Sequence, residues 1–431
     1  MTDLITDRVR RTTTPDRLAE WVDRFAALDE RPGEPGVTRR GYTGLEREAH
    51  RIFADEMTAL GLSVRVDAAG NTIAELRGSR PELGAVGTGS HLDSVPNGGR
   101  FDGVAGVVAA LEAARSVVEA GGTNLRTLRF VAFAGEEGAR FGQACTGSRA
   151  VAGLLEADAV TSLVDADGIT LGEAMTAVGL APEAVQEALW EASDWDTFIE
   201  LHIEQGSVLA DAAIPVGIVD VISGSTRFTI DVAGRASHTG GTPMRLRADA
   251  LTTGSAIILA AEELANDARH HGTRITVGRI DVAPGSITTI AGHCTLHVDV
   301  RDTDSTRQRE SAAELIELAR SISASRGTSI EVRLLADASP AVLPLSTRNH
   351  LVATATELGL PYRIMPSGAS HDTQMVNQVC TGGMIFVPSL NGGVSHSPDE
   401  DTAFEDLAVG VDLLTAALFG LAYPKRPEEN A

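Results

Sequence analysis

With 431 residues, the chain is long enough for two or three domains and for a core that needs no disulfides. Its 36 basic and 59 acidic residues give a formal charge of −23, which disfavours nucleic acid and anionic membrane surfaces as partners. Three widely spaced cysteines, with no apolar leader and no membrane-spanning apolar run, predict a cytoplasmic protein.

The early part of the chain predicts alternating helices and strands. Helices are predicted at 15–28, 46–60 and 104–119, and strands at 63–67, 84–88 and 128–134. Polar clusters follow two of these strands, namely His91-Leu92-Asp93 and Gly135-Glu136-Glu137. This alternation predicts an α/β fold with a mainly parallel sheet, in which functional groups gather at the carboxyl ends of the strands.

The pattern changes near residue 218, where a second domain is predicted to begin. The expected elements are strands at 217–223 and 227–232, a helix at 243–265, strands at 273–282 and 294–301, a helix at 305–326 and a strand at 328–335. The order β-α-β-β-α-β is typical of a ferredoxin-like α+β domain. We therefore expect residues 1–217 and 336–431 to form the catalytic domain, and 218–335 to form an inserted lid or dimerisation domain.

Five segments concentrate histidines and carboxylates at predicted strand ends or in loops. They are His91-Leu92-Asp93, Phe101-Asp102-Gly103, Gly135-Glu136-Glu137-Gly138, His202-Ile203-Glu204-Gln205-Gly206 and Ser395-His396-Ser397-Pro398. In a single such segment, a lone histidine or glutamate is more often a solvated surface residue than a metal ligand. Because imidazole and carboxylate groups together bind divalent metals, five segments, nearly all with flanking glycines, favour a metal centre.

Residue types within these segments suggest individual roles. In an extended chain His91 and Asp93 point to the same side, so Asp93 can accept the second imidazole N–H and orient the ring. Asp102 precedes a predicted helix, so it can either cap that helix or bridge two metals, and we favour bridging. The adjacent Glu136 and Glu137 could form an acidic surface turn, but a metal would let one bind and leave the other as general base.

The chain also resembles a known family. The stretches GSHLDSVPNGGRFDGVAGV, GEEGARF, LHIEQG and FVPSLNGGVSHSPDE are similar to the hydantoinase/carbamoylase branch of the di-zinc aminoacylase and carboxypeptidase superfamily. That branch includes N-carbamoyl-L-amino-acid hydrolases, allantoate amidohydrolases and some β-ureidopropionases. The resemblance implies hydrolysis of a C–N amide or ureido bond in a small carboxylate-bearing substrate, such as an N-carbamoyl-L-amino acid or allantoate.

The resemblance also implies a set of ligands for two divalent metal ions. One metal would be held by His91 and His202, the other by Glu137 and His396, and both by the bridging Asp102. Asp93 would orient a ligand and Glu136 would be the general base. The expected metal is zinc, while manganese, cobalt and nickel also suit such ligands.

Further residues are implied on the substrate side. The implied substrate contacts are Gln205, Thr288, Arg301, Gly368, Ala369 and Ser370. His238 would stabilise the tetrahedral oxyanion, and in relatives its counterpart reaches the partner's site, which implies a homodimer with shared sites. Two positions depart from the family pattern, because Thr288 replaces an asparagine and Thr239 replaces an alanine. Both departures fall on the substrate side and leave the metal ligands intact.

Two other interpretations stay open. An N-acyl-amino-acid aminoacylase or dipeptidase would use the same metals with a pocket for a bulkier acyl group. A non-catalytic metal-binding scaffold would lack a ligand or the base, whereas the five implied ligands and Glu136 are all present in this sequence. An enzyme is therefore favoured on the residues of the site and not on its fold alone.

Overall fold

The structure, a computed structural model, describes residues 13–121 and 123–423, which divide into two compact units. Within the described residues, unit 1 comprises 13–220 apart from residue 122, 343–367 and 371–423, and unit 2 comprises 221–342 with 368–370. The sequence places these boundaries near 218 and 336. The N-terminal segment for which no leader is predicted, residues 1–12, lies outside the described residues.

The main sheet runs in the order β1-β2-β4-β3-β5-β15-β6-β13, where β13 is Ala341–Val342, and β14 pairs with β6. Its strands are β1 (Ser63–Val66), β2 (Thr72–Leu76), β3 (Ala85–His91), β4 (Leu128–Phe133), β5 (Trp195–Ile203), β6 (Val216–Ile222), β14 (Tyr362–Ser367) and β15 (Thr381–Val387). The central four, β4-β3-β5-β15, are parallel, and the strands that flank them are antiparallel. This confirms a mixed α/β fold built on a large parallel centre.

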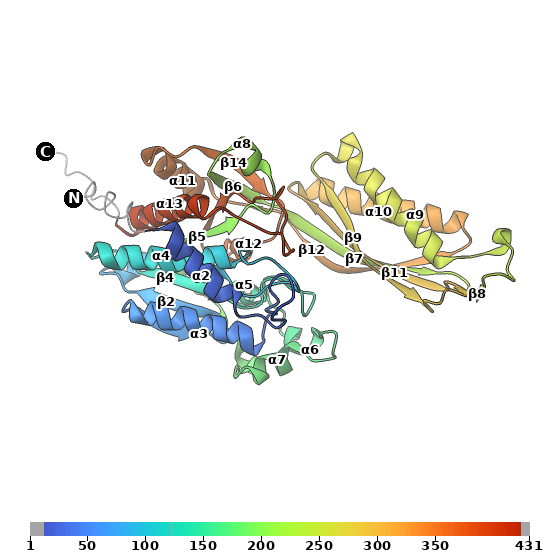
Figure 1. The fold of residues 1–431 in the computed structure, drawn as a ribbon, viewed down its shortest axis with the longest axis horizontal. Helices are drawn as coiled ribbons and strands as arrows, with labels where there is room; N and C mark the ends of the chain where they lie inside the picture. The colour runs from blue at the N-terminus through green and yellow to red at the C-terminus, as the bar shows by residue number, and fades with distance from the viewer. Residues whose placement is uncertain (1–12, 122, 424–431) are drawn as a thin grey trace. The chain divides into compact units, whose positions relative to one another are not determined.

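Helices cover the main sheet on both faces. They are α2 (Pro15–Ala26), α3 (Gly44–Ala59), α4 (Val104–Ala120), α5 (Thr146–Val151), α6 (Ala159–Ser162), α7 (Leu171–Ala177), α8 (Val208–Ala212), α11 (Leu345–Glu357), α12 (Asp372–Val376) and α13 (Phe404–Ala422). Helices α4 and α13 lie side by side and are apolar nearly all round, so they form the centre of the largest core (Figure 1). The opposite face carries a smaller aromatic cluster around Trp190 and Trp195.

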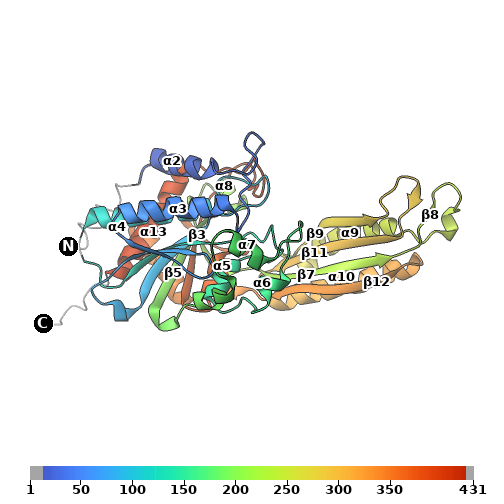
Figure 2. The same cartoon turned by 90° about the horizontal axis from the view of Figure 1, so that it is seen from below.

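Unit 2 has its own sheet and its own core. Its elements are β7 (Gly224–Ala233), β8 (Ser237–His238), α9 (Ala250–Asn266), β9 (Arg274–Ala283), β10 (Thr289–Ile290), β11 (His293–Asp302), α10 (Ser305–Ser325), β12 (Ser329–Ala338) and β13 (Ala341–Val342). Four antiparallel strands run in the order β12-β7-β11-β9. Helices α9 and α10 pack together on one face, which leaves the other face of this sheet without a helix from unit 2 (Figure 2).

Two sequence expectations differ from the structure. The predicted helix at 243–265 starts too early, because Met244–Leu246 forms a short 3₁₀ turn and α9 begins only at Ala250. The side chain of Asp249 accepts a hydrogen bond from the Thr252 amide and so caps the helix at that point. Strand β2 follows the turn at Gly70 and is not predicted at all. No helix in the described part of the chain has the length and apolar content needed to cross a lipid bilayer.

Candidate metal centre

The parallel strands carry the predicted ligands to one edge of the main sheet. His91 ends β3, His202 lies near the end of β5, and Glu136 follows β4 after a short turn. His396 lies in the loop after β15. Because β4, β3, β5 and β15 are parallel neighbours, their carboxyl ends meet at the same edge, where α/β proteins place their ligands.

Asp102 lies between two groups of side chains that could each hold a metal ion. One group is His91, Asp102 and His202, and the other is Asp102, Glu137 and His396. Asp102 Oδ1 is 3.1 Å from His202 Nε2 and 3.5 Å from His91 Nε2. Asp102 Oδ2 is 3.3 Å from His396 Nε2. Each carboxylate oxygen therefore faces a different group, which is the arrangement that a bridging ligand requires.

The structure does not give Asp102 the alternative role of helix cap. The N-cap of α4 is Gly103, and no side chain hydrogen-bonds the first turn of that helix. Burial opposes ionisation of Asp102, but hydrogen bonds to His202, His396 and His91 hold its pKa well below the usual range. The carboxylate of Asp102 is therefore ionised, and it does not cap helix α4.

Glu136 and Glu137 have different surroundings. Glu137 Oε2 is 3.2 Å from His396 Nε2, and its other oxygen is buried without a hydrogen-bond partner among the described residues. Glu136 is 3.9 Å from His91 Nε2 and accepts a hydrogen bond from the Cys145 thiol at 3.0 Å. Burial raises the pKa of Glu136 to about 7, against the opposing charge of His91. A carboxyl group with a pKa near neutrality is suited to accept and return a proton.

Asp93, which was predicted to orient His91, also contacts the two adjacent glutamates. Its carboxylate lies 3.5 Å from His91 Nδ1, but that nitrogen forms its hydrogen bond, at 3.2 Å, with the Asp93 backbone carbonyl. The two carboxylate oxygens accept the backbone amides of Glu136 at 2.9 Å and Glu137 at 3.1 Å. Asp93 therefore fixes the turn that presents both glutamates, a role that depends on a contact 43 residues away in sequence.

Three supporting residues have no individual role in the sequence prediction. Glu400 Oε1 accepts the backbone amides of Phe101 and Asp102, both at 3.0 Å, and Glu400 Oε2 accepts the Ser395 hydroxyl at 2.6 Å. Cys145, the third, hydrogen-bonds Glu136. Both Glu400 and Ser395 fall inside the stretch FVPSLNGGVSHSPDE, and the available sequence signal for Glu400 is an acidic residue four positions after His396.

Gln205 and His396 share an unusual backbone. Their φ angles are 55° and 56°, in the left-handed region that non-glycine residues seldom adopt. Such strain typically costs about 1–3 kcal/mol and concentrates at functional sites. Gln205 Nε2 donates to Asp102 Oδ2 at 2.8 Å, so the predicted substrate contact is also a neighbour of Asp102.

The donor set fits a pair of divalent cations. Three imidazoles and two carboxylates converge, and most of them are buried, which is costly for carboxylates unless cations compensate. The buried oxygens Glu137 Oε1 and Gln205 Oε1 have no hydrogen-bond partner in the described residues. Such unpartnered buried acceptors are those that a bound cation or its ligands would satisfy.

The remaining predicted residues belong to unit 2. His238 Nδ1 accepts the backbone amides of Gly240 and Gly241 at 3.1 and 3.0 Å, which fixes the orientation of the ring. The two positions that depart from the family pattern contact each other, because Thr239 donates through its amide and hydroxyl to the Thr288 carbonyl. Strands β8 and β10 pair His238 with Thr289, so His238 and Thr288 are close neighbours.

Arg301 lies beside the predicted substrate loop. Its Nη1 donates to the Gly368 carbonyl at 3.5 Å, and its Nε donates to Asp299 at 3.0 Å. Ser223 donates to the same Gly368 carbonyl at 2.8 Å. The segment 368–370 groups with unit 2, so Arg301, Gly368, Ala369 and Ser370 are brought together there.

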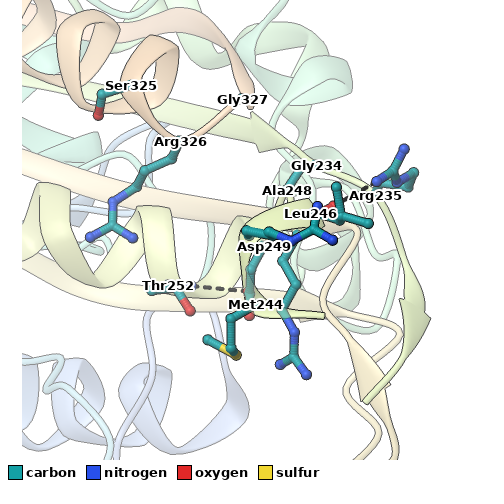
Figure 3. A pocket seen from close by; sticks show the side chains of 12 residues that line it. Gly234, Arg235, Met244, Leu246, Ala248, Asp249, Thr252, Ser325, Arg326 and Gly327 are labelled. Carbon is teal, nitrogen blue, oxygen red and sulfur yellow. Dashed lines mark hydrogen bonds between the residues drawn. The ribbon is translucent and has the colours of Figure 1, made fainter. Parts of the chain in front are cut away.

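A separate cavity of about 700 Å³ opens on unit 2 and holds none of the predicted site residues (Figure 3). Its walls include the arginines Arg235, Arg245, Arg247 and Arg326. Arg247 donates from its guanidinium to the backbone carbonyls of Thr239 and Thr242. Arg247 therefore connects this wall of the cavity to residues 239–242, the segment that follows His238.

Comparison with known proteins places the chain among metal-site hydrolases of this architecture. Residues 87–419 match the profile of peptidase family M20/M25/M40. The N-carbamoyl-L-amino-acid amidohydrolase of Paenarthrobacter aurescens is 40% identical over 387 residues, covering 90% of this chain and 93% of that protein. The allantoate amidohydrolase of Escherichia coli K12 is 36% identical over 414 residues, covering 94% and 97%. The crystal structure of AtUAH in complex with glyoxylate superposes with a TM-score of 0.90 at 32% identity, covering 96% and 99%.

Proposed function

The chain belongs to peptidase family M20/M25/M40, and from that premise we propose that it is a two-metal amidohydrolase acting on N-carbamoyl-L-amino acids or related ureido acids. The relatives named N-carbamoyl-L-amino-acid amidohydrolase and allantoate amidohydrolase support this substrate class, since each aligns with at least 90% of the chain. We take zinc as the metal, because imidazole and carboxylate ligands suit it.

The observation that carries the proposal is the position of Asp102. It belongs to both three-residue groups, so one buried carboxylate joins two neighbouring sites. We assign His91 and His202 to one metal and Glu137 and His396 to the other, with Asp102 shared. Two divalent ions held there would supply Lewis acidity to the scissile carbonyl and favour ionisation of water.

Glu136 is the proposed general base. It accepts a proton from the attacking water and returns it to the leaving nitrogen. The Cys145 thiol hydrogen-bonds one of its oxygens, and Asp93 fixes its backbone amide, so the carboxylate is oriented from two sides.

The substrate side is assigned to unit 2. A guanidinium binds a carboxylate through two parallel hydrogen bonds, so Arg301 would hold the substrate carboxylate. His238 would donate to the tetrahedral oxyanion, and Thr288 would contact the substrate with its hydroxyl. Catalysis then requires unit 2 to act as a lid that meets the metal centre, and we propose a homodimer in which His238 serves the partner's site.

A product assay tests the reaction. Purified, metal-loaded protein would be given N-carbamoyl-L-amino acids, allantoate, β-ureidopropionate and N-acetyl-L-amino acids, with ammonia and free amino acid both measured. We expect ammonia release with the ureido substrates only. Turnover confined to the N-acetyl substrates would replace this proposal with an aminoacylase.

Two variants separate the roles of the adjacent glutamates. Glu136→Gln should keep both metals and lose at least ~10²-fold in kcat, the usual size of a general acid–base contribution. Glu137→Gln should lose metal, because it removes an assigned ligand. Metal analysis of the two proteins decides between the roles, and loss of metal from Glu136→Gln would require them to be exchanged.

Subunit exchange tests the shared site. Glu136→Gln and His238→Ala are each expected to be inactive, but a mixed dimer would contain one site with both residues intact. Activity should return after the two proteins are mixed and allowed to exchange. If exchange is confirmed by mass and activity stays absent, His238 acts in its own subunit or takes no part in catalysis.

A further inference from the structure

The helix-free face of the sheet in unit 2 carries an unusual pair of like charges. Arg301 on β11 and Arg274 on β9 lie directly opposite each other in the antiparallel register. Their neighbours Val300 and Ile275 belong to the core beneath α9 and α10, so both arginines point to the opposite, helix-free face. Like charges directly opposite in a sheet are destabilising, and this arrangement therefore calls for an explanation.

The surrounding charges do not neutralise the pair. Arg227 and Arg301 share one carboxylate, Asp299, at 3.4 and 3.0 Å. Arg274 has no ion pair with any carboxylate in the part of the chain that the structure describes. This corner of the face therefore has three guanidinium groups and one carboxylate, an excess of two positive charges. In a chain with a formal charge of −23, such a local excess favours a negatively charged ligand.

The Arg274 guanidinium also lies beside the predicted substrate loop. A Cβ atom at Gly368 would come within 3.2 Å of its Cζ and Nη1 atoms, so the absence of a side chain there makes room for the guanidinium. The same Gly368 contacts Arg301 through its carbonyl oxygen. The two guanidinium groups thus flank one backbone segment, and each can offer a fork of N–H donors to an oxyanion.

We propose that Arg274 is a specificity-determining residue that, together with Arg301, selects substrates carrying two carboxylates. The proposal rests on the proposed function and narrows its substrate class to N-carbamoyl derivatives of dicarboxylic amino acids. Arg301 binds the carboxylate common to all N-carbamoyl amino acids, and Arg274 binds the side-chain carboxylate. A second guanidinium stabilises the binding of a substrate that carries a second carboxylate, but it forms no ion pair with a neutral side chain of the same shape.

The test compares N-carbamoyl-L-aspartate with N-carbamoyl-L-asparagine, which differ in charge and hardly in shape. The wild type should favour the aspartate substrate by about tenfold or more in kcat/KM, the effect of one good ion pair of about 1.4 kcal/mol. Arg274→Gln should lower kcat/KM for the aspartate substrate and so abolish that preference. Arg279→Gln on the same strand, whose arginine pairs with Asp281, is the matched control and should keep the preference.

A binding measurement separates this proposal from the proposed function. Succinate would be titrated calorimetrically into chelator-treated wild type, Arg274→Gln and Arg279→Gln, so that the result depends on no catalytic step. Binding lost only in Arg274→Gln supports the two-arginine site even if no ureido substrate is hydrolysed. Equal succinate binding in all three proteins, or an unchanged aspartate preference in Arg274→Gln, would overturn it.

Discussion

Replacing Gly103 with alanine should disable the metal centre through a single added carbon atom. Gly103 has φ 65° and lies directly after Asp102. A Cβ atom there would lie 2.4 Å from Cε1 and Nδ1 of His91. Carbon contacts are favourable at about 3.5 Å or more, so the imidazole must move by roughly 1 Å. Metal–ligand distances tolerate only about 0.2 Å, and His91 would no longer reach the metal proposed for it.

The other end of the same helix offers a matched control. Gly121 has φ 66°, and a Cβ atom there would meet nothing within 4 Å. Both alanine variants carry the cost of a positive φ, about 1–3 kcal/mol, but only Gly103→Ala adds the collision with His91. The difference between the two variants therefore isolates the effect on the metal centre.

Two measurements test this prediction. All three tryptophans, Trp21, Trp190 and Trp195, are buried in unit 1, so tryptophan fluorescence follows the unfolding of that unit in urea. Both variants should unfold at lower urea than the wild type. Zinc affinity, measured by equilibrium dialysis, should fall at least about tenfold in Gly103→Ala and stay unchanged in Gly121→Ala. Equal zinc affinity in the two variants would refute the reasoning.

Three further predictions follow from other contacts. In Asp93→Asn one of the two separate oxygens becomes a donor facing the Glu136 or Glu137 amide, so unit 1 should lose about 2–4 kcal/mol of stability in urea. Asp29→Asn is the control and should lose under about 1 kcal/mol of stability, because a single oxygen of Asp29, Oδ1, accepts both backbone hydrogen bonds. Equal losses of stability in Asp93→Asn and Asp29→Asn would contradict this prediction. Chelation should abolish activity and added zinc or manganese should restore it, whereas an active preparation without bound transition metal would exclude the two-metal proposal. Burial lowers the pKa of His50 in the folded protein well below 6.5. Above pH 6.5 the imidazole is mainly neutral in both the folded and the unfolded chain. As the pH falls below 6.5 the unfolded chain binds a proton that the folded protein does not, so the free energy of unfolding decreases. Between about pH 7.5 and about pH 5.5, the free energy of unfolding in urea should fall less steeply with pH in His50→Gln than in the wild type, by up to about 1.4 kcal/mol per pH unit. Identical slopes in the two proteins would contradict this.

The elements predicted well are those whose signals are local. The helix at Val104–Ala120 and the strand at Leu128–Phe133 have long apolar runs and glycine or polar boundaries, which a short window of sequence contains. The start of α9 was misplaced because the capping hydrogen bond of Asp249 competes with a helical pattern that extends back to Pro243. Strand β2 was missed because its pairing partners, β1 and β4, complete a sheet that no local window reveals.

The candidate site shows the same difference between local signals, which the sequence contains, and long-range contacts, which it does not reveal. The five residues proposed as ligands can be singled out from the sequence because their types and glycine-rich settings form an ordered series of motifs. The contacts that hold them were not found, since they join distant segments, as in Glu400 with the Asp102 amide and Cys145 with Glu136. The Arg274–Arg301 pair was likewise hidden, because only the register of two strands places these residues opposite each other.

The hydrogen bond between the Leu343 amide and the Asp220 carbonyl, at 2.9 Å, joins the two ends of the longer interruption of unit 1, residues 221–342. The ends of the interruption are thus already adjacent, and closing them needs only a tight turn with little loop entropy. Apart from residues 368–370, unit 2 is therefore one continuous module that a single genetic insertion could have introduced. A shortened gene that joins these ends would encode a minimal metalloprotein retaining the five assigned ligands but lacking Arg301. Such a protein is a natural starting scaffold for grafting other substrate-binding modules.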